Sequence, residues 1–224
     1  MMLAEWFTAF GTILLAIVAA FQDQIRSYLS KPKLDLTINL SPPDCHKTNL
    51  VRSTGPDTQE VAECYYIRLR VRNLGNYRAE YVEAQAAELH RELENRELQK
   101  VETFLPMNLV WSHVRTAYLP SLSPGMEKLL DLGHIIDPAR RAAFPSEENL
   151  ALNVPPGQPT LALDTEVIST TPGHILAPGV YFLKLVLGAS NSKPLVKSLR
   201  IRLIGTWHPD TYIMFGGCVL VEVQ

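Results

Sequence analysis

The sequence predicts an all-β fold, an antiparallel β-sandwich preceded by one N-terminal transmembrane helix. Three features carry this prediction: an uncharged apolar stretch near the N-terminus, short runs of alternating apolar and polar residues after it, and 16 prolines and 12 glycines between those runs. Period-two alternation is typical of half-buried strands, and frequent turn residues are typical of sandwiches. We therefore expect a transmembrane helix with a juxtamembrane extension over residues 1–31 and a β-sandwich domain over residues 32–224.

The apolar stretch runs from Trp6 to Phe21 and contains no charged residue. As a helix it is about 24 Å long, and extension back to Met1 gives about 31 Å, close to the roughly 30 Å of a bilayer core. Aromatic residues lie near both ends, as interfacial anchors do. Since Pro32 disfavours helical conformation in the residue before it, the helix is expected to end near Ser30.

Two alternatives to an uncleaved anchor remain open. The stretch could be a signal peptide, because Val18 and Ala20 are suitable small residues before a cut at Phe21. A signal peptide has a basic N-terminal region, however, and Met1–Glu5 contains no basic side chain. The stretch could also be a helix buried in the core of a protein, since such helices are apolar on all sides.

Small side chains recur every fourth residue along the helix. A stripe of this kind lets two membrane helices approach closely, which predicts a homo-oligomer or a partner helix. The predicted helix-packing residues are Thr8, Thr12, Ala16 and Ala20.

The charges that flank the helix predict its orientation. No Lys or Arg precedes the stretch, whereas Arg26, Lys31 and Lys33 follow it. The side with more basic residues stays in the cytoplasm, so we expect an inner (plasma) membrane protein with a cytoplasmic β-domain. Three cysteines without a CxxC motif also suit a reducing compartment.

The remaining chain is expected to contain eight or nine strands. Residues 41–60 are polar and rich in proline, so we predict a long loop there; the charged residues 90–100 predict a protruding hairpin that turns near Asn95, and residues 205–224 an edge segment that packs back on the domain. In the strand ending at Asn73, three arginines should lie on the face opposite the apolar residues. The main predicted strands are 33–40, 64–73, 82–89, 127–136, 160–168, 180–189 and 195–204.

Three motifs carry a resemblance to known families. Arg70–Asn76, followed by Ala79 and Val82, resembles a V-x-N-x-G-x…A strand–turn–strand of bacterial immunoglobulin-like domains of the cell-adhesion-related type. Leu176–Tyr181 is similar to the L-x-P-G-x-Y sequence that leads into a late strand of such sandwiches. The pattern Phe104–His113 resembles a group of uncharacterised bacterial single-pass membrane proteins. The resemblance implies an immunoglobulin-like sandwich and supplies no activity.

The sequence contains few residues arranged for chemistry. It has no phosphate-binding glycine loop, no G-x-S-x-G and no H-E-x-x-H, and a net charge of −2 without a basic run argues against nucleic acid. Cys45-His46, with Cys64, is the nearest approach to a metal site, and Asp131 and Asp137 around Gly133-His134 are the nearest to an acid–base pair. Ordinary loop and strand-edge positions explain both, so we expect no catalytic residue, metal or cofactor.

One irregular apolar segment is a candidate partner-binding surface. Its Trp111 either fills one end of the sandwich, with a carbonyl for the indole N–H, or faces a partner as aromatic hot spots do. The candidate partner-binding residues are Leu109, Trp111 and Tyr118.

The sequence as a whole predicts a membrane-tethered, non-enzymatic protein-interaction or assembly module. A related possibility is an accessory subunit of a membrane complex, in which the helix is the interface. The alternative from a different class is an exported binding domain, facing the periplasm or cell surface after signal cleavage.

Overall fold

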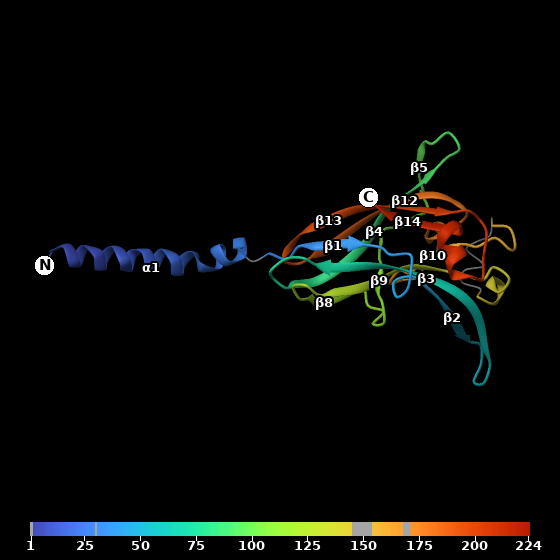
Figure 1. Ribbon diagram of the computed structural model, residues 1–224, viewed down its shortest axis with the longest axis horizontal. Helices are drawn as coiled ribbons and strands as arrows, with labels where there is room; N and C mark the ends of the chain where they lie inside the picture. Colours follow the sequence, from blue (N-terminus) through green and yellow to red (C-terminus); the bar gives the residue numbers. More distant parts are fainter. Residues whose placement is uncertain (1, 30, 145–153, 168–170) are drawn as a thin grey trace.

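The computed structural model describes residues 2–29, 31–144, 154–167 and 171–224. Two antiparallel sheets pack face to face, and the helix α1 (Met2–Leu29) extends away from one end of them (Figure 1). This architecture confirms the predicted β-sandwich. The strands are more numerous than expected, because the segment from Leu98 to Leu122 contributes four short ones.

Sheet A has the strand order β1-β3-β9-β10-β11, with β2 added to β3 and β7 to β9. Its strands are β1 (Leu34–Thr37), β2 (His46–Ser53), β3 (Gln59–Asn73), β7 (Val110–Trp111), β9 (Glu127–Ile136), β10 (Leu161–Leu163) and β11 (Ile175–Leu176). Sheet B has the order β14-β13-β12-β4-β5, with β6 and β8 added to β4. Its strands are β4 (Ala79–Glu92), β5 (Leu98–Lys100), β6 (Met107–Asn108), β8 (Tyr118–Leu122), β12 (Gly179–Ala189), β13 (Ser192–Leu203) and β14 (Val219–Val223). Short helical turns lie at η1 (Arg141–Ala143), η2 (Pro172–His174), α3 (Thr211–Ile213) and η3 (Met214–Cys218).

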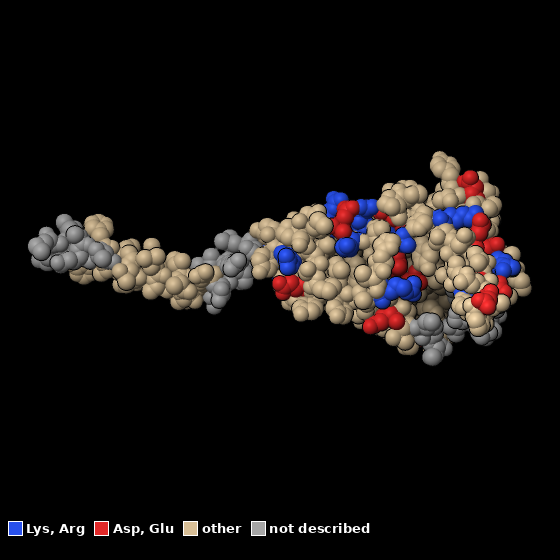
Figure 2. Space-filling model, turned by 90° about the horizontal axis from the view of Figure 1, so that it is seen from below, with Lys and Arg blue, Asp and Glu red and all other residues tan. Residues whose placement is uncertain are grey.

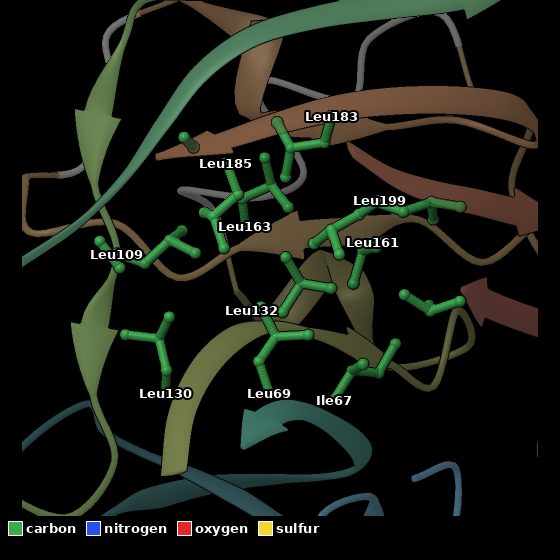
Figure 3. Packing of buried hydrophobic residues seen from close by; sticks show 14 of the residues in the cluster. Ile67, Leu69, Leu109, Leu130, Leu132, Leu161, Leu163, Leu183, Leu185 and Leu199 are labelled. Atoms are coloured by element: carbon green, nitrogen blue, oxygen red, sulfur yellow. The ribbon is translucent and has the colours of Figure 1, made fainter. Parts of the chain in front are cut away.

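The core lies between the two sheets and follows from the period-two alternation. From Tyr65 to Val71 in β3, every second side chain points inward and is fully buried, and the arginines between them point outward, as predicted. Figure 3 shows side chains of both sheets meeting in the middle. Among them are Ile67, Leu69, Leu130 and Leu132 from sheet A and Leu183, Leu185 and Leu199 from sheet B.

Of two connecting segments predicted from the sequence, one prediction is wrong and the other is confirmed. The expected long loop over 41–60 is wrong, because β2 pairs with the first half of β3 from His46↔Tyr66 to Ser53↔Gln59. Much of this hairpin is exposed on both faces, so its sequence lacks the apolar alternation that marks a half-buried strand. The hairpin near Asn95 is confirmed: β4 and β5 are joined by a turn in which Leu93 N donates to Glu97 O at 2.9 Å.

The C-terminal segment packs back on the sandwich, as predicted. It ends in β14, which pairs with β13 at the edge of sheet B. Ahead of it, the Asp210 side chain accepts hydrogen bonds from Tyr212 N and Ile213 N and begins a short helical turn. Trp207 lies against the ring of the buried Tyr65, with ring centroids 5.0 Å apart.

Helix α1 differs from the sandwich in the exposure of its apolar side chains. The described side chains, Trp6, Phe7 and residues 9–22, are exposed apart from the half-buried Gly11. Within the part of the chain that the structure describes, no helix is both long enough and apolar enough to qualify as a membrane span. Of the predicted helix-packing residues, Thr12, Ala16 and Ala20 are exposed, and the side chain of Thr8 lies outside the described residues.

A single buried amide, that of Asn73 at the end of β3, organises the end of the sandwich next to α1. Its Oδ1 accepts hydrogen bonds from Lys33 N (3.1 Å) and Gly75 N (3.0 Å). Its Nδ2 donates to Tyr77 O (2.7 Å) and Leu122 O (2.9 Å). The side chain is fully buried and uses its whole hydrogen-bonding capacity. It therefore joins the linker after α1, the β3–β4 turn and β8.

Replacing this amide should weaken the domain strongly. The substitution Asn73→Ala removes four hydrogen bonds and leaves the buried carbonyl of Leu122 without this donor, so we expect the free energy of unfolding to fall by about 3 kcal/mol. Chemical denaturation of both proteins measures this difference. The control is Asn95→Ala at the exposed β4–β5 turn, where we expect less than about 1 kcal/mol. Equal losses at the two positions would contradict this role of Asn73.

Candidate functional site

The outer face of sheet A carries a cluster of paired charges around β3 and β9. Arg68 on β3 donates from Nε to Asp131 Oδ1 on β9 at 2.8 Å, and the two side chains are only 13% and 6% exposed. Ser112 Oγ donates to the same carboxylate oxygen at 2.5 Å. A bulge between Ile67 and Arg68 sets the register that places Arg68 opposite Asp131. Through Oδ1, this carboxylate therefore connects β3, β9 and the residue that follows β7.

The next arginine along β3 joins two further acidic residues to this cluster. Arg70 binds Asp44 in a bidentate arrangement, with Nε 3.1 Å from Oδ2 and Nη2 on Oδ1, and its Nη1 contacts Glu127. Glu127 also accepts from Arg72, whose Nη2 lies 2.5 Å from Oε2. Asp44 is completely buried, so its charge requires this pairing. These contacts fix the loop before β2 on the outer face of the sheet.

A histidine–aspartate pair lies beside these ion pairs. His134 Nδ1 on β9 is 2.9 Å from Asp164 Oδ1, just after β10, and Tyr66 stacks on the imidazole with ring centroids 5.4 Å apart. The guanidinium of Arg68 lies over the Tyr66 ring, 5.3 Å from the ring centroid. Burial, and then the negative charge of Asp164, raise the pKa of the Tyr66 hydroxyl to about 12. Tyr66 therefore stays protonated at neutral pH.

The His134–Asp164 pair resembles the base and its orienting carboxylate in a nucleophilic site. Such a site also requires a hydroxyl or thiol that donates to the imidazole. Ser112, the hydroxyl of this cluster, instead donates to Asp131. The second oxygen of Asp164, Oδ2, is buried without a hydrogen-bond partner among the described residues. Asp164 therefore orients the His134 imidazole, while the Ser112 hydroxyl is committed to Asp131.

A cleft of about 360 Å³ lies next to the ion pairs. The turn after β7 forms one wall, and it holds His113 and Arg115 in left-handed conformations (φ 70° and 51°), which are strained for residues with a side chain. The lining residues are Pro43, Arg70, Trp111, Ser112, His113, Val114, Leu119, Glu127, Lys128 and Leu129. This cleft combines apolar walls with charged groups at its rim.

The three predicted partner-binding residues are not equivalent. Leu109 and Trp111 are buried, at 0% and 1% exposed, whereas Tyr118 is 48% exposed. Among these side chains, therefore, only Tyr118 offers substantial surface to a partner in this structure. The Trp111 indole fills the sandwich, but its Nε1 has no hydrogen-bond partner among the described residues, unlike the usual buried tryptophan.

The two chemical clusters that the sequence suggested do not form. Cys45 belongs to the main core, whereas Cys64 lies in a separate small cluster with Phe144. All three cysteines are buried, and burial raises the pKa of the Cys45 thiol to about 11. Within residues 2–29, 31–144, 154–167 and 171–224, no group of three or more His, Cys, Asp or Glu side chains is placed to hold a metal ion.

The acidic residues of the suggested acid–base pair have separate roles. Asp131 pairs with Arg68, and Asp137 accepts a hydrogen bond from Ala139 N in the turn after β9. The carboxylate that contacts His134 is Asp164, which the sequence analysis did not select. It lies 30 residues away along the chain, and only the pairing of β9 with β10 brings it near.

Comparisons with known proteins leave the family open. No protein-family model matches the chain, and no curated protein matches it. A crystal structure described as Northeast Structural Genomics Consortium target SoR45 is 12% identical and aligns over 79% of this chain and 92% of that chain, with a TM-score of 0.29. A similarity at this level supports no argument about function.

Removing the buried carboxylate of Asp131 should destabilise the sandwich. The substitution Asp131→Ala leaves the Arg68 guanidinium poorly exposed and without its carboxylate, so we expect the free energy of unfolding to fall by about 3 kcal/mol. The matched control is Glu222→Ala, which removes the exposed partner of Arg200 at 3.5 Å and should cost less than about 1 kcal/mol. Denaturant titrations compare the two, and similar small changes in both would contradict a structural role for the Arg68–Asp131 pair.

The imidazole of His46 should titrate below its ordinary range. Burial, and then the positive charge of Arg68, lower the pKa of His46 from 6.5. Because the folded state binds this proton less readily than the unfolded chain, the stability that His46 contributes is complete above pH 6.5 and decreases as the pH falls below it. An NMR titration of the imidazole measures this pKa. Arg68→Gln should raise it and Arg72→Gln should leave it unchanged; a wild-type pKa at or above 6.5 would contradict the prediction.

Proposed function

We propose that this chain is a membrane-tethered, non-enzymatic protein-interaction or assembly module. In this proposal α1 inserts into the inner (plasma) membrane, and an immunoglobulin-like sandwich remains in the cytoplasm. One observation carries the proposal: an exposed apolar helix is joined to a sandwich that already has a closed core of its own. The helix therefore requires a partner outside the domain.

The exposed surface of α1 is large for a helix in water. Nine large apolar side chains between Trp6 and Phe21 are 49–75% exposed. The helix side chains that the structure describes, residues 6, 7 and 9–22, include no Lys, Arg, Asp or Glu, and Figure 2 shows one face of this uncharged stretch. Burying a large apolar side chain gains about 1.5–3 kcal/mol, so covering this surface is worth on the order of 10 kcal/mol. A bilayer or another apolar helix can supply the cover.

The orientation follows from the flanking charges. Arg26, Lys31 and Lys33 follow the apolar stretch, and residues 1–5 contain no Lys or Arg. Basic flanks remain on the cytoplasmic side, which favours a cytoplasmic sandwich. The small residues Thr12, Ala16 and Ala20 provide a stripe along which a second copy or a partner helix could approach.

The sandwich has features that suit protein binding. The β2–β3 hairpin projects from it (Figure 1), and the paired Val51 and Val61 are 52% and 43% exposed on that hairpin. The immunoglobulin-like assignment is supported by the position of its motifs. The motif that includes Asn73 occupies the β3–β4 turn, and the motif that ends at Tyr181 leads into β12.

Membrane extraction of the full chain tests the tether. We expect the protein to resist carbonate extraction, and the fragment Lys33–Gln224 to be soluble. Leu14→Arg combined with Ile17→Arg should release most of the full chain, because each charge costs about 2.5–3.5 kcal/mol at the centre of a span. Val196→Arg, at a 52% exposed position on the sandwich, is the control and should leave the protein in the membrane fraction.

Orientation is tested separately in spheroplasts. Protease added outside should leave the sandwich whole, and a C-terminal alkaline phosphatase fusion should be inactive. A mature N-terminus at Phe21, or digestion of the sandwich without lysis, would instead establish the exported binding domain. Extraction of the wild-type chain by carbonate would contradict the membrane tether itself.

A further inference from the structure

The end of the sandwich next to α1 is built from four short segments. They are the linker residues 31–33, the β3–β4 turn 74–78, the β8–β9 turn 123–126 and residues 190–193, which form the β12–β13 turn and the start of β13. We call this surface the helix-proximal end. Figure 1 shows α1 leaving the sandwich at this end.

Hydrogen bonds make the helix-proximal end one connected surface. The linker is fixed to the first turn, because Lys31 N donates to Asn76 Oδ1 at 3.0 Å and Leu74 N donates to Lys33 O at 2.7 Å. A Cβ at Gly75 would lie 2.3 Å from the Lys31 carbonyl oxygen, so the linker passes too close for any other residue there. Asn73 joins the linker to the β8–β9 turn, since its backbone oxygen accepts from Gly125 N at 2.8 Å.

The β12–β13 turn is attached in the same way. Asn191 Oδ1 accepts from Glu80 N at 3.1 Å, and Asn191 Nδ2 donates to Arg78 O at 2.8 Å. Ser190 N also donates to Glu80 O. All three turns and the linker therefore move together with the core of the sandwich.

Basic side chains outnumber acidic ones at this surface. The four segments contain Lys31, Lys33, Arg78 and Lys193 and no Asp or Glu, although the chain as a whole has a net charge of −2. Arg78 and Lys193 are exposed, and neither forms an ion pair within the described residues. Two acidic residues flank the segments: Glu80 on β4, and Glu127 on β9, which is already paired with Arg70 and Arg72.

Apolar side chains lie between these positive charges. Leu74 and Met126, at the tips of two of the turns, are 50% and 55% exposed, and Tyr77 is 37% exposed. Basic residues interspersed with exposed apolar and tyrosine side chains are the composition that binds at the headgroup level of a bilayer.

The length of α1 places this surface near the membrane. Residues 22–29 continue the helix for about 12 Å beyond Phe21, where the apolar stretch ends. The headgroup layer is about 5–8 Å thick on each side, and the Debye length at physiological salt is about 8 Å. Since one residue separates the end of α1 at Leu29 from the fixed Lys31, the basic side chains come within electrostatic reach of the headgroups.

We propose that the helix-proximal end is a contact surface for anionic lipid headgroups, which holds the sandwich against the membrane in one orientation. This inference rests on the proposed insertion of α1. Anionic lipid is the occupant that matches both the net positive charge and the attachment of this surface to a membrane helix. The β2–β3 hairpin then points away from the contact, toward the cytosol.

Fluorescence quenching in nanodiscs tests the contact with the full-length chain. The variant Ser192→Cys places a thiol beside Lys193, and a thiol-reactive fluorophore will label it selectively because the three native cysteines are buried. The quencher is a nitroxide on the lipid headgroup. We expect quenching to be at least about two-fold stronger in phosphatidylglycerol-rich discs than in phosphatidylcholine discs, and the difference to vanish at high ionic strength.

Charge variants test whether the lipid effect comes from this surface or from the overall charge of the protein. Adding Arg78→Glu and Lys193→Glu should abolish the lipid difference, whereas the same change of charge at the distal β4–β5 hairpin, Arg96→Glu with Lys100→Glu, should preserve it. Equal quenching in the two lipids, or equal loss in both double variants, would overturn the proposal. Strong quenching that ignores lipid charge and salt would overturn it too. Incorporation into neutral discs measures the insertion of α1 separately. A protein that did not incorporate would contradict the proposed membrane tether and not the lipid contact.

Discussion

The position of α1 relative to the sandwich depends on one buried side chain, Asn73. Its amide forms hydrogen bonds with backbone groups of the linker, of a turn and of a neighbouring strand. Separating these segments would therefore expose buried polar groups or leave them without hydrogen-bond partners. The linker is thereby part of the domain from Lys31 onward. Since only one residue separates α1 from this hydrogen-bonded surface, the surface must stay close to the end of the helix.

Poorly exposed polar groups also determine the structure at the outer face of sheet A. The alternation that points the apolar residues of β3 inward necessarily points Arg68, Arg70 and Arg72 outward, and the neighbouring strand β9 and the loop before β2 provide carboxylates for all three. Such pairs favour a specific arrangement of loops more than they favour stability, because desolvation offsets much of their attraction. The cluster therefore explains how the irregular segments are positioned on the sheet. Trp111 Nε1 and Asp164 Oδ2, which are buried without a hydrogen-bond partner in the described part of the chain, belong to segments that flank β9.

The helix and the sandwich differ in where their apolar side chains lie. The sandwich buries its apolar residues between two sheets, whereas the described side chains of α1 remain exposed although they are equally apolar. Membrane insertion, a cytoplasmic sandwich and lipid contact at the helix-proximal end are proposals that reconcile the two, since one bilayer would cover the helix and attract the basic turns.

The sequence alone determined the sandwich, the strand β9 from Glu127 to Ile136, the hairpin near Asn95 and the outward face of the β3 arginines, because period-two alternation is a local property. It missed β2, whose exposed faces need no apolar pattern. Tertiary structure alone buried Leu109 and Trp111 and brought Asp164 to His134. Those outcomes depend on which strands become neighbours, and partners far apart in the chain leave no periodic signal near either residue.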